Sequence, residues 1–344
     1  MDCSVHSGRG WAVTERAASP LLEVAGLEKS FIQRPSLTAR LFGAPTKRVQ
    51  AVNGVSFSLQ RGESLGLIGE SGCGKSTLGR CVLMLHTPSA GTIRFDGIDL
   101  TTIGHEDLRR ARRRMQMIFQ DPYASLNPRR TVEEIVSLPL RIHERVGKTE
   151  LHKRTAAIVE RVGLLPSQLD RYPHQFSGGQ RQRIGIARAL VLRPDLVVCD
   201  EPVSALDVSV QAQVIELLRE LRREFNLTYL FISHDLAVVG HLSDRIAVMY
   251  LGEIVEIAES RRLIAAPLHP YTQALIAAAP RLDRAAARAG HLGGDPPSPL
   301  DPPPGCRFHT RCPHAMPTCR TTAPPLRQVA VGHSVACHLA GAMT

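Results

Sequence analysis

The sequence lacks any hydrophobic run long enough to cross a membrane. Although 43% of the 344 residues are hydrophobic, no stretch reaches the roughly 18 consecutive apolar residues that a spanning helix needs. Residues 1–26 also lack the basic segment and the following apolar segment of a secretory signal. We therefore expect a cytosolic chain, able to dock on a membrane surface, with about two domains and a substantial core.

Lysine and aromatic residues are scarce, although the chain is strongly basic. Five of the 42 basic residues are lysines, so most of the net charge of +10 comes from scattered arginines. The densest basic run, residues 109–114, contains no aromatic residue. A solvated helix face is therefore a better interpretation of this run than a nucleic-acid-binding stripe.

The C-terminal region lacks the C-x₂-C pairs that are usual in structural zinc sites. It nevertheless contains four cysteines, with five, six and 17 residues between them: Cys306, Cys312, Cys319 and Cys337. Four cysteines in a segment too short for its own core predict a metal site. A mixed zinc site and reduced thiols without a metal are the alternatives. The histidines available to a zinc site are His309, His314, His333 and His338. The other cysteines are dispersed and are interpreted as reduced thiols.

One glycine-rich stretch carries the strongest functional signal. Residues 69–77, GESGCGKST, match the phosphate-binding loop G-x-x-x-x-G-K-[ST]. Its glycines permit a tight turn that brings backbone N–H groups close to phosphates. Lys75 offers a cation to the β and γ phosphates, and the Ser76 hydroxyl is a ligand for Mg²⁺. The nucleotide-binding residues predicted from this loop are Gly69, Ser71, Gly72, Gly74, Lys75, Ser76 and Thr77.

The hydrophobic patterns predict an α/β domain with a helical insertion. Strands are expected at residues 22–27 (at a sheet edge), 51–59, 64–68, 91–97, 115–119, 196–202, 228–233, 245–250 and 253–257. Helices are expected at residues 78–85, 131–141, 149–162, 179–192, 208–225 and 271–279. We divide the chain into a loose N-terminus (1–20), a main domain (21–260) with the helical insertion at about 123–193, and a C-terminal extension (261–344).

Acidic and polar residues follow two strands that are expected to be buried. Asp200 suits a Mg²⁺ shell, and Glu201 suits the activation of an attacking water. His234 follows the strand at 228–233, and such residues at strand ends mark the ligand edge of an open α/β sheet. A second glycine turn, FSGGQRQR at residues 176–183, opens a helix and predicts a second phosphate contact. One chain therefore offers two phosphate-binding turns for what we interpret as one nucleotide.

Together these motifs resemble the ATP-binding cassette (ABC) family over roughly residues 21–257. The resemblance implies a P-loop NTPase fold, with a RecA-like core sheet, an antiparallel β edge and an inserted helical subdomain. It implies that GESGCGKST is Walker A, that residues 196–200 are Walker B and that FSGGQRQR is the signature motif. It further implies that Gln120 is the Q-loop glutamine, which also ligates Mg²⁺ together with Ser76 and Asp200. His234 would be the switch histidine, and Asp207 would end the D-loop.

The resemblance also explains two phosphate-binding turns in one chain. Two cassettes of this family pack head to tail, so that the signature motif of one closes over ATP held by Walker A of the other. The signature residues that would act on the partner's ATP are Ser177, Gly178, Gly179 and Gln180. Phe31 matches the aromatic position that stacks on adenine, and Phe42 is its rival.

Three further stretches resemble the peptide-permease ATPases, which serve oligopeptide, dipeptide and nickel importers. They are QDPYASLNP (120–128), PLHPYT (267–272) and FHTRCP (308–313). This resemblance implies an ATP-hydrolysing subunit on the cytoplasmic face of the cell membrane. Its partners would be two membrane permease subunits, a second, paralogous ATPase and an extracytoplasmic peptide-binding protein. It also implies that the four C-terminal cysteines hold a [4Fe–4S] cluster. The alternative function is a soluble ABC ATPase acting on nucleic acid or ribosomes, and the permease-like tail disfavours an exporter.

Overall fold

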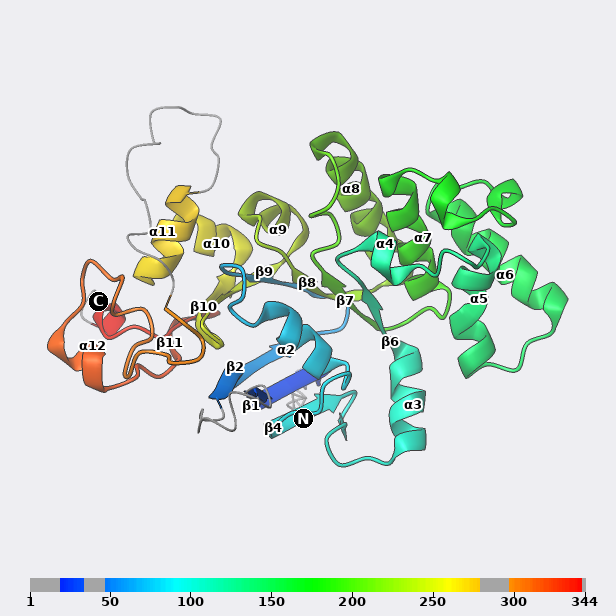
Figure 1. Cartoon of the computed structure of the whole chain (residues 1–344). Helices are drawn as coiled ribbons and strands as arrows, with labels where there is room; N and C mark the ends of the chain where they lie inside the picture. The colour runs from blue at the N-terminus through cyan, green and yellow to red at the C-terminus, as the bar shows by residue number, and fades with distance from the viewer. Residues whose placement is uncertain (1–18, 34–46, 279–296, 342–344) are drawn as a thin grey trace, which may run out of the picture.

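Two β-sheets with helices between and around them form the described part of the chain (Figure 1). A computed structural model describes residues 19–33, 47–278 and 297–341. The smaller sheet is antiparallel, with the strand order β2-β1-β4-β5. Its strands are β1 (Leu22–Gln33), β2 (Lys47–Leu59), β4 (Ala90–Phe95) and β5 (Ile98–Asp99).

The larger sheet has eight strands in the order β11-β12-β10-β9-β3-β8-β7-β6. The strands from β9 to β6 are parallel, whereas β10, β12 and β11 add antiparallel pairs at one side. The strands are β3 (Ser64–Ile68), β6 (Met115–Ile118), β7 (Leu196–Asp200), β8 (Thr228–Ile232), β9 (Arg245–Tyr250), β10 (Glu253–Glu259), β11 (Arg327–Ala330) and β12 (His333–Val335).

Helices cover the larger sheet and extend beyond its β6 edge (Figure 1). They are α2 (Lys75–Val82), α3 (His105–Arg114), α4 (Pro122–Ser125), α5 (Val132–His143), α6 (Lys148–Arg161), α7 (Gly178–Leu190), α8 (Val208–Phe225), α9 (Leu236–Leu242), α10 (Ser260–Ala265), α11 (Pro270–Ala278) and α12 (Pro317–Thr321). Short 3₁₀ turns lie at Pro166–Gln168, Pro173–Gln175 and Leu339–Gly341. None of the helices in the described residues is long and apolar enough to cross a membrane.

Strand β7 shows how the core positions the site. Val197 and Cys199 belong to the hydrophobic cluster on one face of the large sheet, and Leu196 and Val198 to the cluster on the other face. Because side chains alternate along a strand, both faces are covered and β7 contains no solvent-facing position. The prediction of a strand buried on both faces is confirmed, and Asp200 is held at its carboxyl end.

Helix α2 begins three residues earlier than its apolar pattern indicates. The sequence predicts a helix from Leu78 to Leu85, but α2 runs from Lys75 to Val82 and contains the end of the glycine-rich motif. Gly74 precedes it with φ 109° and acts as its N-cap. Apolar periodicity marks only the buried side of a helix, so the polar first turn was missed. The helix ends early, and Met84 takes a left-handed φ of 55°.

The prediction that residues 22–27 form an edge strand was wrong. Strand β1 is longer than predicted and pairs with β2 on one side and with β4 on the other, so it lies inside the small sheet. Its second neighbour, β4, comes later in the sequence, after the phosphate loop and α2. Local alternation predicts a strand, but it contains no signal for a partner that arrives so much later.

The arginine run 109–114 does lie on a solvated helix. Helix α3 has no buried residue, and its arginines form contacts within the chain. Arg109 and Arg110 pair with acids one turn earlier, and Arg113 and Arg114 pair with more distant acids. Arg112 donates to the backbone oxygens that follow α2. These contacts support the interpretation of this run as a solvated helix face.

The C-terminal tail extends the large sheet, which the sequence did not predict. Strand β12 pairs with β10, and β11 pairs with β12, so the tail lies at the sheet edge opposite the helical insertion (Figure 1). Phe308 from the tail is buried against Tyr250 and Tyr271, with ring centroids 5.3 and 5.4 Å away. The tail therefore shares the hydrophobic core of the main sheet.

A buried polar cluster fastens the tail to β10. Glu256 accepts hydrogen bonds from the backbone N–H groups of Leu268 (2.8 Å) and His269 (3.0 Å). His333 of β12 places Nε2 2.7 Å from Oε1 of the same carboxyl group. Glu256 and His333 are both buried. One carboxyl group thus joins β10, the segment before α11 and the tail.

Candidate nucleotide site

The phosphate loop has a backbone that requires glycine at two positions. Gly69 and Gly74 have φ values of 155° and 109°. A Cβ on Gly69 would lie 2.2 Å from the carbonyl oxygen of Met249, and one on Gly74 would lie 2.1 Å from that of Ala51. Any side chain at these positions would therefore displace neighbouring backbone, because real Cβ atoms do not approach so closely. The loop lies between the end of β3 and the start of α2.

Lys75 is buried within the loop that it follows. Its Nζ donates to the carbonyl oxygens of Gly69 (2.8 Å) and Glu70 (2.9 Å). It is also the first residue of α2, so it stands beside the free N–H groups and the positive end of that helix. Both features favour a bound anion at this position.

Ser76 and Asp200 provide a pair of oxygen donors beside the loop. The Ser76 hydroxyl donates to Oδ1 of Asp200 over 2.7 Å. Burial raises the pKa of Asp200, whereas the bond from Ser76 and the charge of Arg80 lower it. The Arg80 guanidinium lies 3.9 Å from Oδ2 of Asp200. A hydroxyl and a carboxylate are the kind of ligands that Mg²⁺ prefers.

Glu201 contacts the polar residues that follow the two strands on either side of its own strand. Its Oε2 accepts a hydrogen bond from Nε2 of Gln120 (3.0 Å) and lies 3.3 Å from Nδ1 of His234. Gln120, Glu201 and His234 follow β6, β7 and β8. Glu201 has a left-handed φ of 45°, and its N–H donates to the carbonyl oxygen of Ile232 (3.0 Å). A sharp turn, held by the adjacent strand, thus directs its carboxylate toward the loop.

The loop and these polar residues enclose one pocket of about 420 Å³. It is lined by Ala51, Ser71, Gly72, Gly74, Lys75, Ser76, Thr77, Gln120, Glu201 and His234. Nearly all of these residues were predicted from the sequence as nucleotide-binding or catalytic. Asp200 lies behind the pocket, in contact with Ser76.

The signature residues lie outside this pocket. Ser177 is the N-cap of α7 and forms a reciprocal capping box with Gln180. A Cβ on Gly178 would lie 3.4 Å from Leu206, so the start of α7 is next to the loop that precedes α8. That loop ends at Asp207, the exposed N-cap of α8. The second phosphate-binding turn therefore exists, but it does not face the pocket of its own chain.

Phe31 does not line the described pocket. Its ring lies edge-on to His86 with the centroids 5.5 Å apart, and Nζ of Lys29 lies 5.0 Å from the ring centroid. Its rival, Phe42, lies outside the described residues. The adenine-stacking residue therefore stays a prediction.

Two residues of the site were not predicted. Ala51 lines the pocket, but an alanine within a strand pattern carries no chemical signal. The guanidinium of Arg80 lies near Asp200. The sequence spacing could have predicted this position, because Arg80 follows Ser76 by four residues and so lies on the same helix face.

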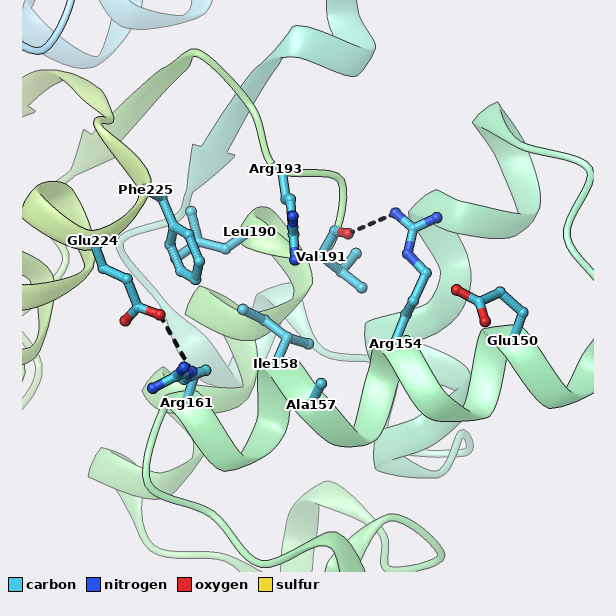
Figure 2. Close-up of a pocket in the computed structure, with 10 residues that line it drawn as sticks. All are labelled: Glu150, Arg154, Ala157, Ile158, Arg161, Leu190, Val191, Arg193, Glu224 and Phe225. Atoms are coloured by element: carbon cyan, nitrogen blue, oxygen red, sulfur yellow. Dashed lines mark hydrogen bonds and ion pairs between the residues drawn. The ribbon is translucent and has the colours of Figure 1, made fainter.

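A second pocket, of about 500 Å³, lies between the helical insertion and the end of α8 (Figure 2). Helix α6, the end of α7 and the end of α8 line it. Arg161 of α6 lies 3.3 Å from Glu224 of α8, and Arg154 of α6 donates to the carbonyl oxygen of Val191 (3.2 Å). Its lining contains no residue predicted to bind nucleotide, so the nucleotide is assigned to the phosphate-loop pocket.

The four tail cysteines lie near one another but do not form a metal-binding geometry. The N–H of Cys306 donates to the carbonyl oxygen of Cys319 over 2.8 Å. Burial, together with the nearby Cys319, Cys337 and Cys312, raises the pKa of Cys306 to about 11. Within the described ranges, no group of three or more His, Cys, Asp or Glu residues is arranged to hold a metal ion.

The chain is similar to known proteins of one family. Residues 52–204 match the family model described as ABC transporter. Residues 255–319 match the model described as oligopeptide/dipeptide transporter, C-terminal region. The oligopeptide transport ATP-binding protein AppF of Bacillus subtilis is 52% identical over 323 residues, covering 93% of this chain and 97% of that protein. The chain belongs to the ABC transporter family.

Solved structures of ABC cassettes share the fold. The cassette MJ0796, solved as a dimer in a post-hydrolysis state bound to ADP and Pi, is similar with a TM-score of 0.61 and 28% identity. The similarity covers 70% of this chain and 99% of that one. The cbiO1 protein of Clostridium perfringens, part of the ABC transporter complex cbiONQ, has a TM-score of 0.61 and 26% identity over 72% of this chain and 91% of its own. The predicted fold, an ABC nucleotide-binding domain, is confirmed.

Proposed function

We propose that this ABC protein hydrolyses ATP to energise the import of peptides across the cytoplasmic membrane. One observation carries the proposal: the phosphate loop shares a pocket with Gln120, Glu201 and His234, in a chain whose C-terminal region matches the oligopeptide/dipeptide transporter model. The name of AppF as an oligopeptide transport ATP-binding protein supports the choice of substrate class. The two matched regions also support a division into a cassette (21–260) and an extension (261–344).

The loop residues would bind the triphosphate. Lys75 has its ammonium group at the carbonyls of the loop, and moving it to the β and γ phosphates would exchange those neutral acceptors for charged ones. Residues 71–77 would donate their N–H groups to the phosphates. Ser76, Gln120 and Asp200 would hold Mg²⁺, which supplies neutralisation of phosphate charge when bound.

Glu201 would orient and deprotonate the attacking water. Its carboxylate faces the pocket and is steadied by Gln120, and His234 stands beside it to contact the γ phosphate. These positions suit a general base and a residue that senses the terminal phosphate. The residues that follow β6, β7 and β8 would thus act on one ATP.

The site would be completed by a second cassette. Ser177 is exposed, and the start of α7 does not line the pocket of its own chain. Ser177, Gly178, Gly179 and Gln180 would contact the ATP of a partner, and Asp207 would lie at the same interface. The dimeric state of MJ0796 supports this arrangement. The partner would be a paralogous cassette.

The remaining partners follow from the importer assignment. We place the chain on the cytoplasmic face of the membrane, bound to two permease subunits that receive peptide from an extracytoplasmic binding protein. The pairing of the α3 arginines within the chain argues against a nucleic-acid surface at that helix.

The test distinguishes peptide import from the alternative, an ABC ATPase that acts on nucleic acid or ribosomes. The protein is expected to sediment with membranes that contain the permease subunits. Its ATPase activity should rise with peptide-loaded binding protein and stay unchanged with DNA or RNA. Stimulation by nucleic acid, without stimulation by the loaded binding protein, would support the alternative instead.

We also propose that Cys306, Cys312, Cys319 and Cys337 hold a [4Fe–4S] cluster. Their shared location and the resemblance of the tail support this proposal, although their arrangement without a cluster is not that of a metal site. Analysis of anaerobically purified protein should give about four iron and four sulfide ions per chain. Zinc without sulfide would support the mixed zinc site. The absence of both iron and zinc would support reduced thiols without a metal.

A further inference from the structure

The C-terminal tail contacts the phosphate loop through a partly buried ion pair. Arg311, next to Cys312, places Nη1 2.9 Å from Oε2 of Glu70 and Nη2 3.0 Å from Oε1. The exposed fractions of the two side chains are 5% and 22%. Two parallel N–H···O bonds give a paired geometry that only arginine provides.

A second residue of the extension holds the backbone at the same point. The N–H of Glu70 donates to the hydroxyl oxygen of Tyr271 in α11 over 2.9 Å. Tyr271 is fully buried and packs against Phe308 from the tail. The extension therefore holds Glu70 by its side chain and by its main chain.

Glu70 in turn contacts the lysine of the site. Its carbonyl oxygen accepts a hydrogen bond from Nζ of Lys75 (2.9 Å), whereas its side chain points to the tail and does not line the pocket. The residue lies between Gly69 and Gly72, where the glycines make the backbone intrinsically free. A loop with such freedom loses conformational entropy when it closes on phosphates, unless it is already held in shape.

We propose that Arg311 and Tyr271 are positioning residues for the phosphate loop, so that the C-terminal extension sets the affinity of the cassette for nucleotide. The inference rests on the proposed function of residues 69–77 as the triphosphate site. Neither residue touches the pocket, and both act through Glu70. The extension therefore preorganises the site from outside.

The test is nucleotide affinity of the full-length protein, measured by titration with a fluorescent ATP analogue in the presence of Mg²⁺. Arg311→Gln should raise the Kd by about tenfold or more, because small displacements of positioning groups have effects up to about 10²-fold. Arg311→Lys should give a Kd between those of the wild type and Arg311→Gln, since lysine retains the charge but not the paired geometry. Tyr271→Phe should also raise the Kd. Arg320→Gln, at an exposed tail arginine, is the matched control and should leave it unchanged.

A double-mutant cycle separates positioning from general damage. Glu70→Gln removes the ion pair from the loop side and leaves the tail intact, so it should weaken binding as Arg311→Gln does. Adding Arg311→Gln to Glu70→Gln should cause little further loss, because the two changes remove the same contact. Additive losses would show that Arg311 acts elsewhere and would overturn the proposal.

The outcomes also distinguish this inference from the proposed function. If the wild-type protein binds no nucleotide, the function of the loop is wrong. If the wild type binds and both Arg311→Gln and Glu70→Gln keep its Kd, only the positioning role is wrong. Should Arg311→Gln fail to fold, the Glu70→Gln and Tyr271→Phe titrations still give the answer.

Discussion

Replacing Glu201 by glutamine is expected to lower ATP hydrolysis by about 10²- to 10⁴-fold while ATP remains bound. The change removes the proton acceptor but keeps the size of the side chain and an oxygen for the hydrogen bond from Gln120. The rate is measured as phosphate release by the assembled importer, and binding as the Kd for ATP. Binding should persist, because Lys75 and the loop N–H groups do not depend on this carboxylate.

The matched control is Glu220→Gln on the exposed face of α8, which should leave both quantities unchanged. Near-normal hydrolysis by Glu201→Gln would show that another group activates the water. The position of Glu201 in the pocket, beside Gln120 and His234, makes it the strongest candidate for a base, and its backbone is left-handed. Non-glycine residues in that conformation are uncommon and tend to persist where the surrounding structure and function require them.

Replacing Glu256 by alanine is expected to lower the free energy of unfolding by about 3 to 5 kcal/mol. The carboxyl group is buried and accepts hydrogen bonds from Leu268, His269 and His333. Removing it leaves two backbone N–H groups and an imidazole without their acceptor in a site closed to water. The change should be measured by denaturant unfolding, monitored at several probes.

Glu259→Ala is the control for this prediction. Glu259 ends the same strand but is exposed, so its replacement should change stability by no more than about 0.5 kcal/mol. If Glu256→Ala and Glu259→Ala lower the free energy of unfolding by the same amount, the buried cluster does not fasten the tail to the sheet.

Local signals in the sequence predicted most of the site. The GESGCGKST motif identifies its own chemistry, because the loop, its lysine and its serine are contiguous. Asp200, Glu201 and His234 were found because each follows a short apolar strand, and parallel strands bring their carboxyl ends together. The pocket confirms that Glu201 and His234 meet beside the loop.

Features that depend on distant parts of the chain were not predicted. Strand β1 was placed at an edge because its partner β4 comes after the phosphate loop. The tail strands β11 and β12 join the sheet through contacts that no local pattern reports. The contact between Arg311 and Glu70 joins residues 241 positions apart. Such pairs are set by tertiary packing, and a single sequence does not encode them as a motif.

Peptide uptake by reconstituted vesicles shows whether ATP hydrolysis by this chain drives import. The vesicles contain the two permease subunits and both cassettes, with ATP on the cassette side and labelled peptide delivered by the binding protein. We expect ATP-dependent accumulation of peptide with the wild-type chain and none with Glu201→Gln. Accumulation that persists in the Glu201→Gln vesicles would contradict this expectation.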